Sequence, residues 1–234
     1  MIWAHRGRNR IAPENTMSAF IAALDAGDKG IELDVALSSD YQPVVIHDDT
    51  VDRTTDGTGA VAAMSFKELR LLDAGTWFDS RFADEKLPDL REVLTVIRGR
   101  ALLNIEFKSS AWNENPDISV DTIVMDIVAR SGMDETILYS SFSRKCLERV
   151  RKLSADARIG VLAHRGEDIR DVMRFARQLD AYSIHPNIRD VKKAMRSGLN
   201  QWKGFVYPYT VGSRKNADQM DHVGADGYFA DLPF

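Results

Sequence analysis

Residues 30–35, Gly-Ile-Glu-Leu-Asp-Val, constrain this chain most, because they place two carboxylates two positions apart within an apolar run. Such a run predicts a β-strand, and the alternation of side chains sends Glu32 and Asp34 to one face, about 6.5 Å apart. Two like charges this close in a half-buried setting raise each other's pKa and are unfavourable unless a cation neutralises them. A divalent metal ion meets that need. The alternative is an edge strand with a solvated acidic face, and this motif alone does not decide between the two.

Length and composition indicate one ordinary globular domain. With 234 residues, 44% of them hydrophobic, the chain can bury a sizeable core, and we expect a single domain over residues 1–234. The 31 basic and 35 acidic residues are mixed along the chain and give a net charge of -4, without the basic stripe that binding to nucleic acid requires. The lone Cys146 has apolar neighbours at helical spacing, which predicts an inert thiol in the core.

The N-terminal residues show neither the charged segment nor the apolar run of a signal peptide, and no stretch of the chain is long and apolar enough for a membrane span. We therefore expect a cytoplasmic protein with no stable membrane insertion. The oligomeric state stays open.

A second apolar run, residues 43–46, follows the acidic strand after only five residues. A parallel crossover needs about a dozen residues, so the two runs must form an antiparallel hairpin. With the turn centred near Asp40 and Tyr41, His47 is expected opposite Asp34. Sequence spacing thus brings a histidine to the carboxylate pair.

Apart from this hairpin return, strands and helices alternate along the chain. Strands are expected at residues 2–4, 30–35, 102–108, 136–141, 157–163, 181–185, 204–209 and 226–230. Helices are expected from Met17 to a stop at Gly27, at 90–97, 120–130, around Cys146, and at 167–179, 189–195 and 215–223. Eight strands in regular alternation favour an α/β fold of the closed (β/α)8 TIM barrel type, although counting alone leaves an open doubly wound sheet as the alternative.

The alternation lapses between about residues 50 and 87, which we interpret as a small insertion after the hairpin of the second barrel strand. The capping box that opens at Ser65 predicts a short helix inside it. Two of its glycines, Gly57 and Gly59, fit turns better than a phosphate loop, because no GK[ST] motif and no strand before a helix accompany them.

Chemically active side chains gather at or beside the carboxyl ends of the expected strands, where the active site of a parallel barrel lies. They are His5 and Arg6, Glu32 and Asp34, His47, and Glu106 with Lys108. Three carboxylates suit a hard, oxygen-seeking ion such as Mg²⁺ or Ca²⁺. The two cations beside such a metal make sense if an anion binds there, and a phosphate fits best. Two histidines then provide the base and the acid that phosphodiester cleavage needs.

A set of short motifs runs through nearly the whole chain and resembles the glycerophosphodiester phosphodiesterase family of the bacterial cytosolic type. The motifs are His5-Arg6-Gly7, Pro13-Glu14-Asn15-Thr16, Glu32-Leu33-Asp34-Val35, Val45-Ile46-His47-Asp48, Arg53-Thr54-Thr55, Ile105-Glu106-Phe107-Lys108, Ser140-Ser141-Phe142, Asp226-Gly227 and Asp231-Leu232-Pro233. The resemblance implies a metal on Glu32, Asp34 and Glu106, catalytic His5 and His47, and phosphate contacts from Arg6 and Lys108.

The chain departs from the family pattern near the end of the seventh barrel strand. The family usually has Trp-Thr-Val-Asn there, and this chain has Tyr209-Thr210-Val211-Gly212, which keeps an aromatic residue and loses an amide. Tyr209 and His185 are candidates for the substrate pocket, although His185 also fits a satisfied loop histidine. His222 is expected in solvent.

The sequence Ala-His-Arg-Gly occurs a second time, at residues 163–166, again after an expected strand. It lacks the Pro-Glu-Asn-Thr continuation of the first copy. We therefore expect His164 at the surface or at the pocket rim, without a catalytic role.

The leading hypothesis is a metal-dependent hydrolase that cuts a small-molecule glycerophosphodiester into sn-glycerol 3-phosphate and an alcohol. A lysophospholipase D-like phosphodiesterase is the first alternative; it would need an apolar surface near the mouth, for which Trp77, Phe78, Phe82 and Trp112 are candidates. A non-catalytic phosphodiester-binding barrel is the second, and the paired histidines argue against it.

Overall fold

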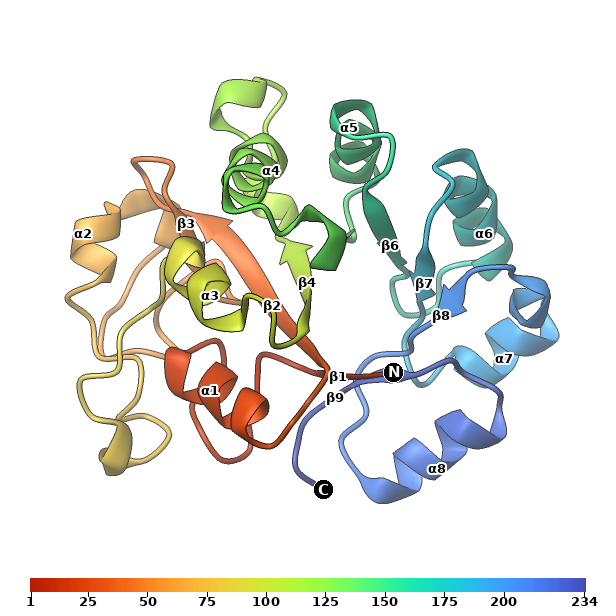
Figure 1. The fold of residues 1–234 in the computed structure, drawn as a ribbon, viewed down its shortest axis with the longest axis horizontal. Coiled ribbons are helices and arrows are strands. Elements are labelled where there is room, and N and C mark those ends of the chain that lie inside the picture. The colour runs from red at the N-terminus through yellow and green to blue at the C-terminus, as the bar shows by residue number, and fades with distance from the viewer.

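The computed structural model describes residues 1–234 and contains one nine-stranded sheet surrounded by helices (Figure 1). The strands are β1 (Ile2–Ala4), β2 (Gly30–Leu37), β3 (Pro43–Val45), β4 (Leu102–Phe107), β5 (Ile137–Ser141), β6 (Arg158–Leu162), β7 (Ser183–His185), β8 (Phe205–Val206) and β9 (Tyr228–Ala230). The α-helices are α1 (Met17–Asp25), α2 (Phe66–Leu69), α3 (Leu90–Ile97), α4 (Val120–Ser131), α5 (Arg144–Leu153), α6 (Ile169–Gln178), α7 (Val191–Arg196) and α8 (Arg214–His222). Short 3₁₀ helices occupy Val61–Ala63, Ser80–Phe82, Ser109–Ala111, Pro116–Ile118, Asp134–Thr136 and Leu199–Gln201.

Eight of the strands form a parallel barrel. Their order is β8-β7-β6-β5-β4-β2-β1-β9, so each strand lies beside its neighbour in the chain once β3 is set aside, and β9 returns to β1. The remaining gap is bridged by the segment after β8, where the Val211 amide donates to the Phe229 carbonyl at 2.8 Å and the Phe229 amide donates to the Pro208 carbonyl at 3.0 Å. The predicted (β/α)8 barrel is confirmed, and an open doubly wound sheet is excluded.

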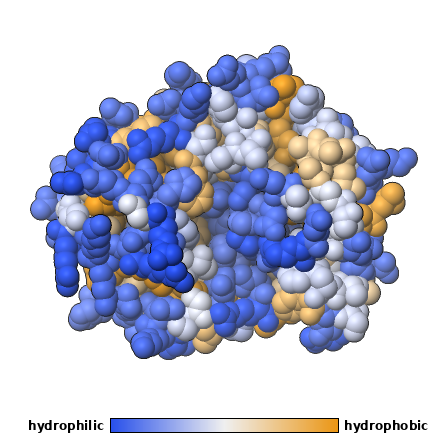
Figure 2. All heavy atoms as spheres, turned by 180° about the vertical axis from the view of Figure 1, so that it is seen from behind, coloured by the Kyte–Doolittle hydropathy of each residue, from blue (hydrophilic) through white to orange (hydrophobic).

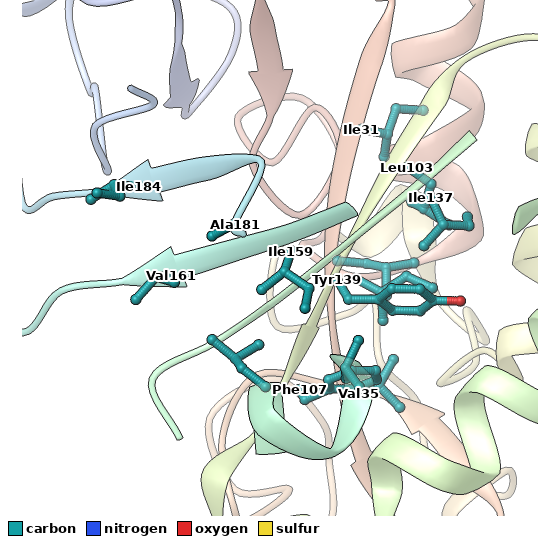
Figure 3. Close-up of a cluster of buried hydrophobic side chains, with 14 of the residues drawn as sticks. Ile31, Val35, Leu103, Phe107, Ile137, Tyr139, Ile159, Val161, Ala181 and Ile184 are labelled. Atoms are coloured by element: carbon teal, nitrogen blue, oxygen red, sulfur yellow. The ribbon is translucent and has the colours of Figure 1, made fainter. Parts of the chain in front are cut away.

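Alternation along the strands separates two environments. Ile31, Leu103, Ile137, Ile159 and Ile184 belong to the main hydrophobic cluster of 47 buried residues (Figure 3). This cluster also includes the inner faces of the surrounding helices, for instance Leu90, Val93, Leu94 and Ile97 of α3, the four positions that the helical spacing predicts. The residues between them in the strands point the other way, into the barrel. The polar residues of the strands are therefore collected inside it.

Near the amino ends of the strands, the barrel interior is filled by aromatic and aliphatic side chains. Trp3, Leu138, Tyr207 and Phe229 form a separate buried cluster, with Trp3 stacked on Phe229 at 5.9 Å between ring centroids. This cluster closes the barrel at the amino ends of the strands, so that a pocket can open only toward their carboxyl ends.

The predicted hairpin is confirmed, with a register one residue away from the expected one. Val35 pairs with Val45, and the Ile46 amide donates to the Asp34 carbonyl at 3.1 Å, so Ile46 rather than His47 lies opposite Asp34. Because β3 ends at Val45, strict alternation no longer applies at His47, and its ring still reaches the barrel mouth.

The segment between β3 and α3 packs beside the hairpin (Figure 1) and shares a small hydrophobic core with it. That core contains Ala36, Val44, Ile46, Val51, Val61, Leu69, Ala74 and Leu87. The predicted capping box of Ser65 and Glu68 begins α2, which is only one turn long.

The outer surface is mixed in character. The face in Figure 2 is largely hydrophilic, with small, separated apolar patches. None of the helices combines the length and the apolarity that are needed to cross a bilayer.

Candidate active site

A pocket of about 200 Å³ opens at the carboxyl ends of the barrel strands. It is lined by His5, Arg6, Glu32, His47, Asn104, Glu106, Ser140, Phe142, Leu162, His185, Tyr209, Thr210 and Phe229. A wider hollow of about 830 Å³ lies at the opposite end of β6, β7 and β8 and contains none of these residues. Size therefore does not locate the site, whereas the convergence of polar side chains does.

Three carboxylates meet at one side of this pocket. Asp34 and Glu106 are partners in the β2–β4 ladder, and one oxygen from each of Glu32, Asp34 and Glu106 lies within 4.8 Å of the others. Burial, together with the charges of Asp34 and Glu106, raises the pKa of Glu32 well above its ordinary value. Burial and the charge of Asp34 raise the pKa of Glu106 to about 7. Glu32 Oε1 is buried without a hydrogen-bond partner. This arrangement fits a divalent cation, which would relieve the repulsion and take the free oxygen as a ligand.

Two cationic side chains border the carboxylates. Arg6 Nε lies 3.3 Å from Asp34 Oδ2, and Lys108 Nζ lies 3.6 Å from both Asp34 Oδ1 and Glu106 Oε1. Burial alone would raise the pKa of Asp34, but Arg6 and Lys108 outweigh it and lower that pKa to about 2. Asn15 Nδ2 also donates to Asp34 at 2.9 Å. Asp34 is thus held ionised from several sides.

The turn after β1 fixes Arg6 in this position. Arg6 and Gly7 both have positive φ, 57° and 79°, and the Arg6 amide donates to Glu32 Oε2 at 2.8 Å. A Cβ atom on Gly7 would lie 2.7 Å from the Ala19 backbone, so only glycine lets the turn pack against α1.

His5 faces the pocket with one ring nitrogen engaged. Its Nδ1 lies 2.7 Å from Asp231 Oδ1, which also accepts a hydrogen bond from Asn9 Nδ2 at 2.7 Å. The contact at Nδ1 leaves Nε2 as the ring nitrogen that is available to another partner.

His47 has the same arrangement on the other side. Its Nδ1 lies 2.5 Å from Asp48 Oδ1, and Arg53 holds Asp48 through an Nε contact of 2.6 Å. Arg53 and Arg6 both bind Glu14, at 2.8 and 2.7 Å, so one chain of ion pairs joins the two sides of the site. Burial, assisted by the charges of Arg6 and Lys108, lowers the pKa of His47.

The other candidates from the sequence lie in different places. His185 is fully buried and lines the pocket, and burial lowers its pKa to about 3. Tyr209 also lines the pocket and donates its hydroxyl to the Ala163 carbonyl at 2.7 Å. His164 is exposed and stacks on Phe142 at 4.5 Å, which places it at the rim, as expected. His222 ends α8, also exposed.

Sequence reasoning missed several residues that organise this site. The sequence motifs contain Asp231, Glu14 and Arg53 but do not indicate their roles, which are to hold His5, Arg6 and Asp48 in place. Sequence reasoning did not single out Asn104, whose polar side chain in the strand Leu-Leu-Asn-Ile-Glu-Phe shares the inward face with Glu106. Alternation from Glu106 was the signal that could have found it.

Fold and site together define the class of this protein. A parallel barrel whose mouth combines an acidic cluster, two cations and two carboxylate-backed histidines is suited to cleavage of a phosphoric diester. The chain matches the model of the Glycerophosphoryl diester phosphodiesterase family over residues 5–233. It belongs to that family and is an enzyme of the phosphoric diester hydrolase class, as the resemblance in the sequence predicts.

Individual relatives agree with this result. A glycerophosphodiester phosphodiesterase from Caldanaerobacter subterraneus subsp. tengcongensis is 35% identical over 234 residues, covering 100% of this chain and 94% of the relative. The solved glycerophosphodiester phosphodiesterase of Agrobacterium tumefaciens has a TM-score of 0.80 and 30% identity, over 99% of this chain and 96% of that one. A phosphodiesterase from Oleispira antarctica, in complex with the product sn-glycerol-3-phosphate, has a TM-score of 0.88 and 28% identity, over 100% of this chain and 93% of that one.

Proposed function

We propose that this enzyme hydrolyses glycerophosphodiesters to sn-glycerol 3-phosphate and an alcohol, using a divalent metal ion and two histidines as general acid and base. The observation that carries the proposal is the pairing of His5 with Asp231 and of His47 with Asp48, in the one pocket that also holds the acidic cluster. Each carboxylate fixes the Nδ1 proton and leaves Nε2 to exchange a proton with the substrate. A binding module would have no use for two such pairs.

Glu32, Asp34 and Glu106 would hold the metal. All three are oxygen ligands, which favours a hard ion, Mg²⁺ or Ca²⁺. When bound, such an ion supplies positive charge to the phosphate oxygens.

Arg6 and Lys108 would bind the phosphate. Their side chains are largely buried, at 15% and 16% exposure, so their charges act in a setting with little solvent screening. The scissile diester would lie between these two cations and the two histidines. One histidine would then face the attacking oxygen, and the other would face the leaving oxygen.

The attacking group is either water or the glycerol hydroxyl next to the phosphate. We favour the internal hydroxyl, because the contacts that hold the phosphate also hold this nucleophile in place. Its oxygen would bond to phosphorus as the bond to the leaving alcohol breaks, and water would then open the resulting cyclic phosphodiester to give sn-glycerol 3-phosphate. A 2-deoxy substrate at saturating concentration discriminates the two routes: a kcat close to normal identifies water, and loss of kcat identifies the hydroxyl.

The structure gives the lysophospholipase D-like alternative little support. Trp77, Phe78 and Phe82 pack edge to face on one another in the insertion, and Trp112 lies under the cations of Lys145 and Arg149. None of the four aromatic residues lines the pocket.

The test is a panel of glycerophosphodiesters and lysophospholipids, assayed with purified protein before and after treatment with a chelator. The proposal expects release of sn-glycerol 3-phosphate from the glycerophosphodiesters, loss of turnover in chelator, and recovery with Mg²⁺ or Ca²⁺. Turnover of lysophospholipids alone would favour the alternative. The single domain over residues 1–234, with an insertion at about 50–87, and the cytoplasmic location both stay predictions.

A further inference from the structure

Four buried polar atoms of the pocket lining have no hydrogen-bond partner: Arg6 Nε, Glu32 Oε1, Asn104 Oδ1 and His185 Nδ1. The first two belong to the charged groups that the proposed function assigns to phosphate and metal. The other two belong to neutral side chains, and that function does not yet use them. A buried polar group without a partner destabilises the fold, so two at one site point to a ligand.

Asn104 is fixed beneath the acidic cluster. It lies on β4, paired in register with Glu32 of β2 and two residues before Glu106, and it is 1% exposed. The other end of its amide donates to Ser140 Oγ at 2.9 Å. Because the Ser140 hydroxyl both donates and accepts, it can pair with only one end of the amide in either orientation, and the other end is left without a partner in the pocket lining.

His185 is fixed from the opposite part of the barrel. Its Nε2 lies 2.7 Å from Ser183 Oγ, and its ring packs 4.8 Å from the Phe229 ring. The ring packs against Gly160 of β6, where an added Cβ atom would lie only 2.4 Å from His185 Cε1. The absence of a side chain at Gly160 therefore leaves the space that the ring occupies. Burial keeps the imidazole neutral, with one ring nitrogen committed to Ser183.

We propose that Asn104 and His185 bind the two hydroxyl groups of the glycerol moiety and so select glycerol esters over other phosphate esters. This inference rests on the proposed function, which places the phosphate at Arg6 and Lys108. A hydroxyl group both donates and accepts, so it suits a free amide end and a free imidazole nitrogen whichever way each is protonated. The Asn104 amide and the His185 imidazole are both neutral, which fits an uncharged diol. A ligand with a second anionic group at this position would find no counter-charge.

The first part of the test uses the wild-type protein loaded with Mg²⁺ or Ca²⁺. Isothermal titration calorimetry compares sn-glycerol 3-phosphate with its 1-deoxy and 2-deoxy analogues and with n-propyl phosphate, which lacks both hydroxyls. Each missing hydroxyl should weaken binding by about tenfold or more, because it leaves a buried polar atom unpaired. Equal affinity for sn-glycerol 3-phosphate and n-propyl phosphate would overturn the inference.

The second part uses Asn104→Leu and His185→Phe. Each variant should lose the discrimination against one deoxy analogue and keep the discrimination against the other, which a merely structural role would not produce. Tyr139→Phe is the matched control, because it removes a buried, unpartnered hydroxyl on the neighbouring strand that does not line the pocket. Its discrimination should equal that of wild type. If the larger side chains prevent folding, Asn104→Ser and His185→Gln replace them.

The outcomes separate the two levels of the argument. Tight binding of sn-glycerol 3-phosphate with full discrimination in both variants would overturn the roles of Asn104 and His185 and leave the proposed function standing. Absence of binding for every phosphate ester would overturn the proposed function, and this inference with it.

Discussion

The sequence Ala-His-Arg-Gly occurs twice in this barrel, each time directly after or at the end of a parallel strand, and the two copies differ in almost everything around them. In the first copy, residues 4–7, His5 is backed by Asp231, and Arg6 contacts Glu14, Asp34 and Glu32. In the second copy, residues 163–166, His164 is exposed against the ring of Phe142, and Arg165 is exposed without an ion pair. The same four residues can therefore serve an active site or a rim.

The neighbouring strands explain this difference. The first copy follows β1, whose neighbour β2 carries Glu32 and Asp34. The second follows β6, whose neighbours β5 and β7 carry Ser140 and Ser183, both paired with Gly160. Charged groups collect around the first copy because carboxylates need counter-charges there. Beside the second copy there is no buried charge to hold Arg165 in place.

Removing a carboxylate from the acidic cluster should have the largest effect, because the buried carboxylates are what distinguishes the surroundings of the first copy from those of the second. Glu32→Gln should lower kcat/KM by about 10³- to 10⁵-fold, the loss expected when metal stabilisation of the transition state is removed. The fold should persist, since the charge removed is one that its neighbours oppose. Steady-state kinetics with Mg²⁺ or Ca²⁺ titration, and a thermal melt, check both points. Full turnover of the wild type in excess chelator, after the metal has dissociated, would contradict the metal requirement.

The two histidines provide the direct comparison between the copies. His5→Ala should lower kcat by about 10²- to 10⁴-fold, the usual range for losing a general acid or base. His164→Ala should change it by less than about threefold, because an exposed side chain that does not line the pocket is being truncated. Equal losses in the two variants would show that the copies have been ranked wrongly.

The carboxylate partners give a smaller and more specific contrast. Asp231→Asn should lower kcat/KM by about 10- to 100-fold, because the amide no longer fixes the Nδ1 proton of His5. Glu167→Gln is the matched control at the second copy, where Glu167 accepts from the His164 backbone at 2.9 Å. Its kinetics should match those of wild type, and a loss as large as that of Asp231→Asn would remove the distinction.

The smallest predicted effect concerns the pH dependence of stability and rests on the buried His185. Burial lowers the folded pKa of His185 to about 3, whereas an unfolded histidine titrates near 6.5. Between these values the unfolded chain binds a proton that the folded protein refuses, so this stabilising contribution is lost as the pH falls below 6.5.

When the pH is lowered from 6.5 to 5, the unfolding free energy of wild type should therefore fall by about 2 kcal/mol more than that of His185→Phe. Denaturant titration at the two pH values measures this difference. Tyr139→Phe, which changes a buried aromatic residue that does not titrate in this range, should follow wild type. A His185→Phe curve parallel to wild type would contradict a neutral His185.

Much of the site follows from local rules that the sequence carries. Alternation placed Glu32 and Asp34 on one face, and the parallel strands brought Glu106 and Lys108 beside them. The hairpin was predicted from loop length, and its register differs by one residue because the turn of residues 38–42 is held by Ser38, whose amide donates to the Gln42 carbonyl at 3.0 Å.

The supporting contacts could not be predicted in this way, because they depend on closure of the barrel. Asp231 is 226 residues from His5 and meets it only because β9 pairs with β1. Arg53 reaches Asp48 and Glu14 from within the insertion, where no strand or helix period applies. The free ends of Asn104 and His185 are visible only once every other hydrogen bond is known.

The pH dependence of kcat/KM tests the central claim, that His5 and His47 act as an acid and base pair, most directly. The wild-type enzyme with a glycerophosphodiester should give a bell-shaped profile, since one histidine must be protonated and the other neutral. His5→Ala and His47→Ala should each remove one limb of the bell, a different limb in each variant, at a lower maximal rate. A profile that keeps both limbs in either variant would contradict the account.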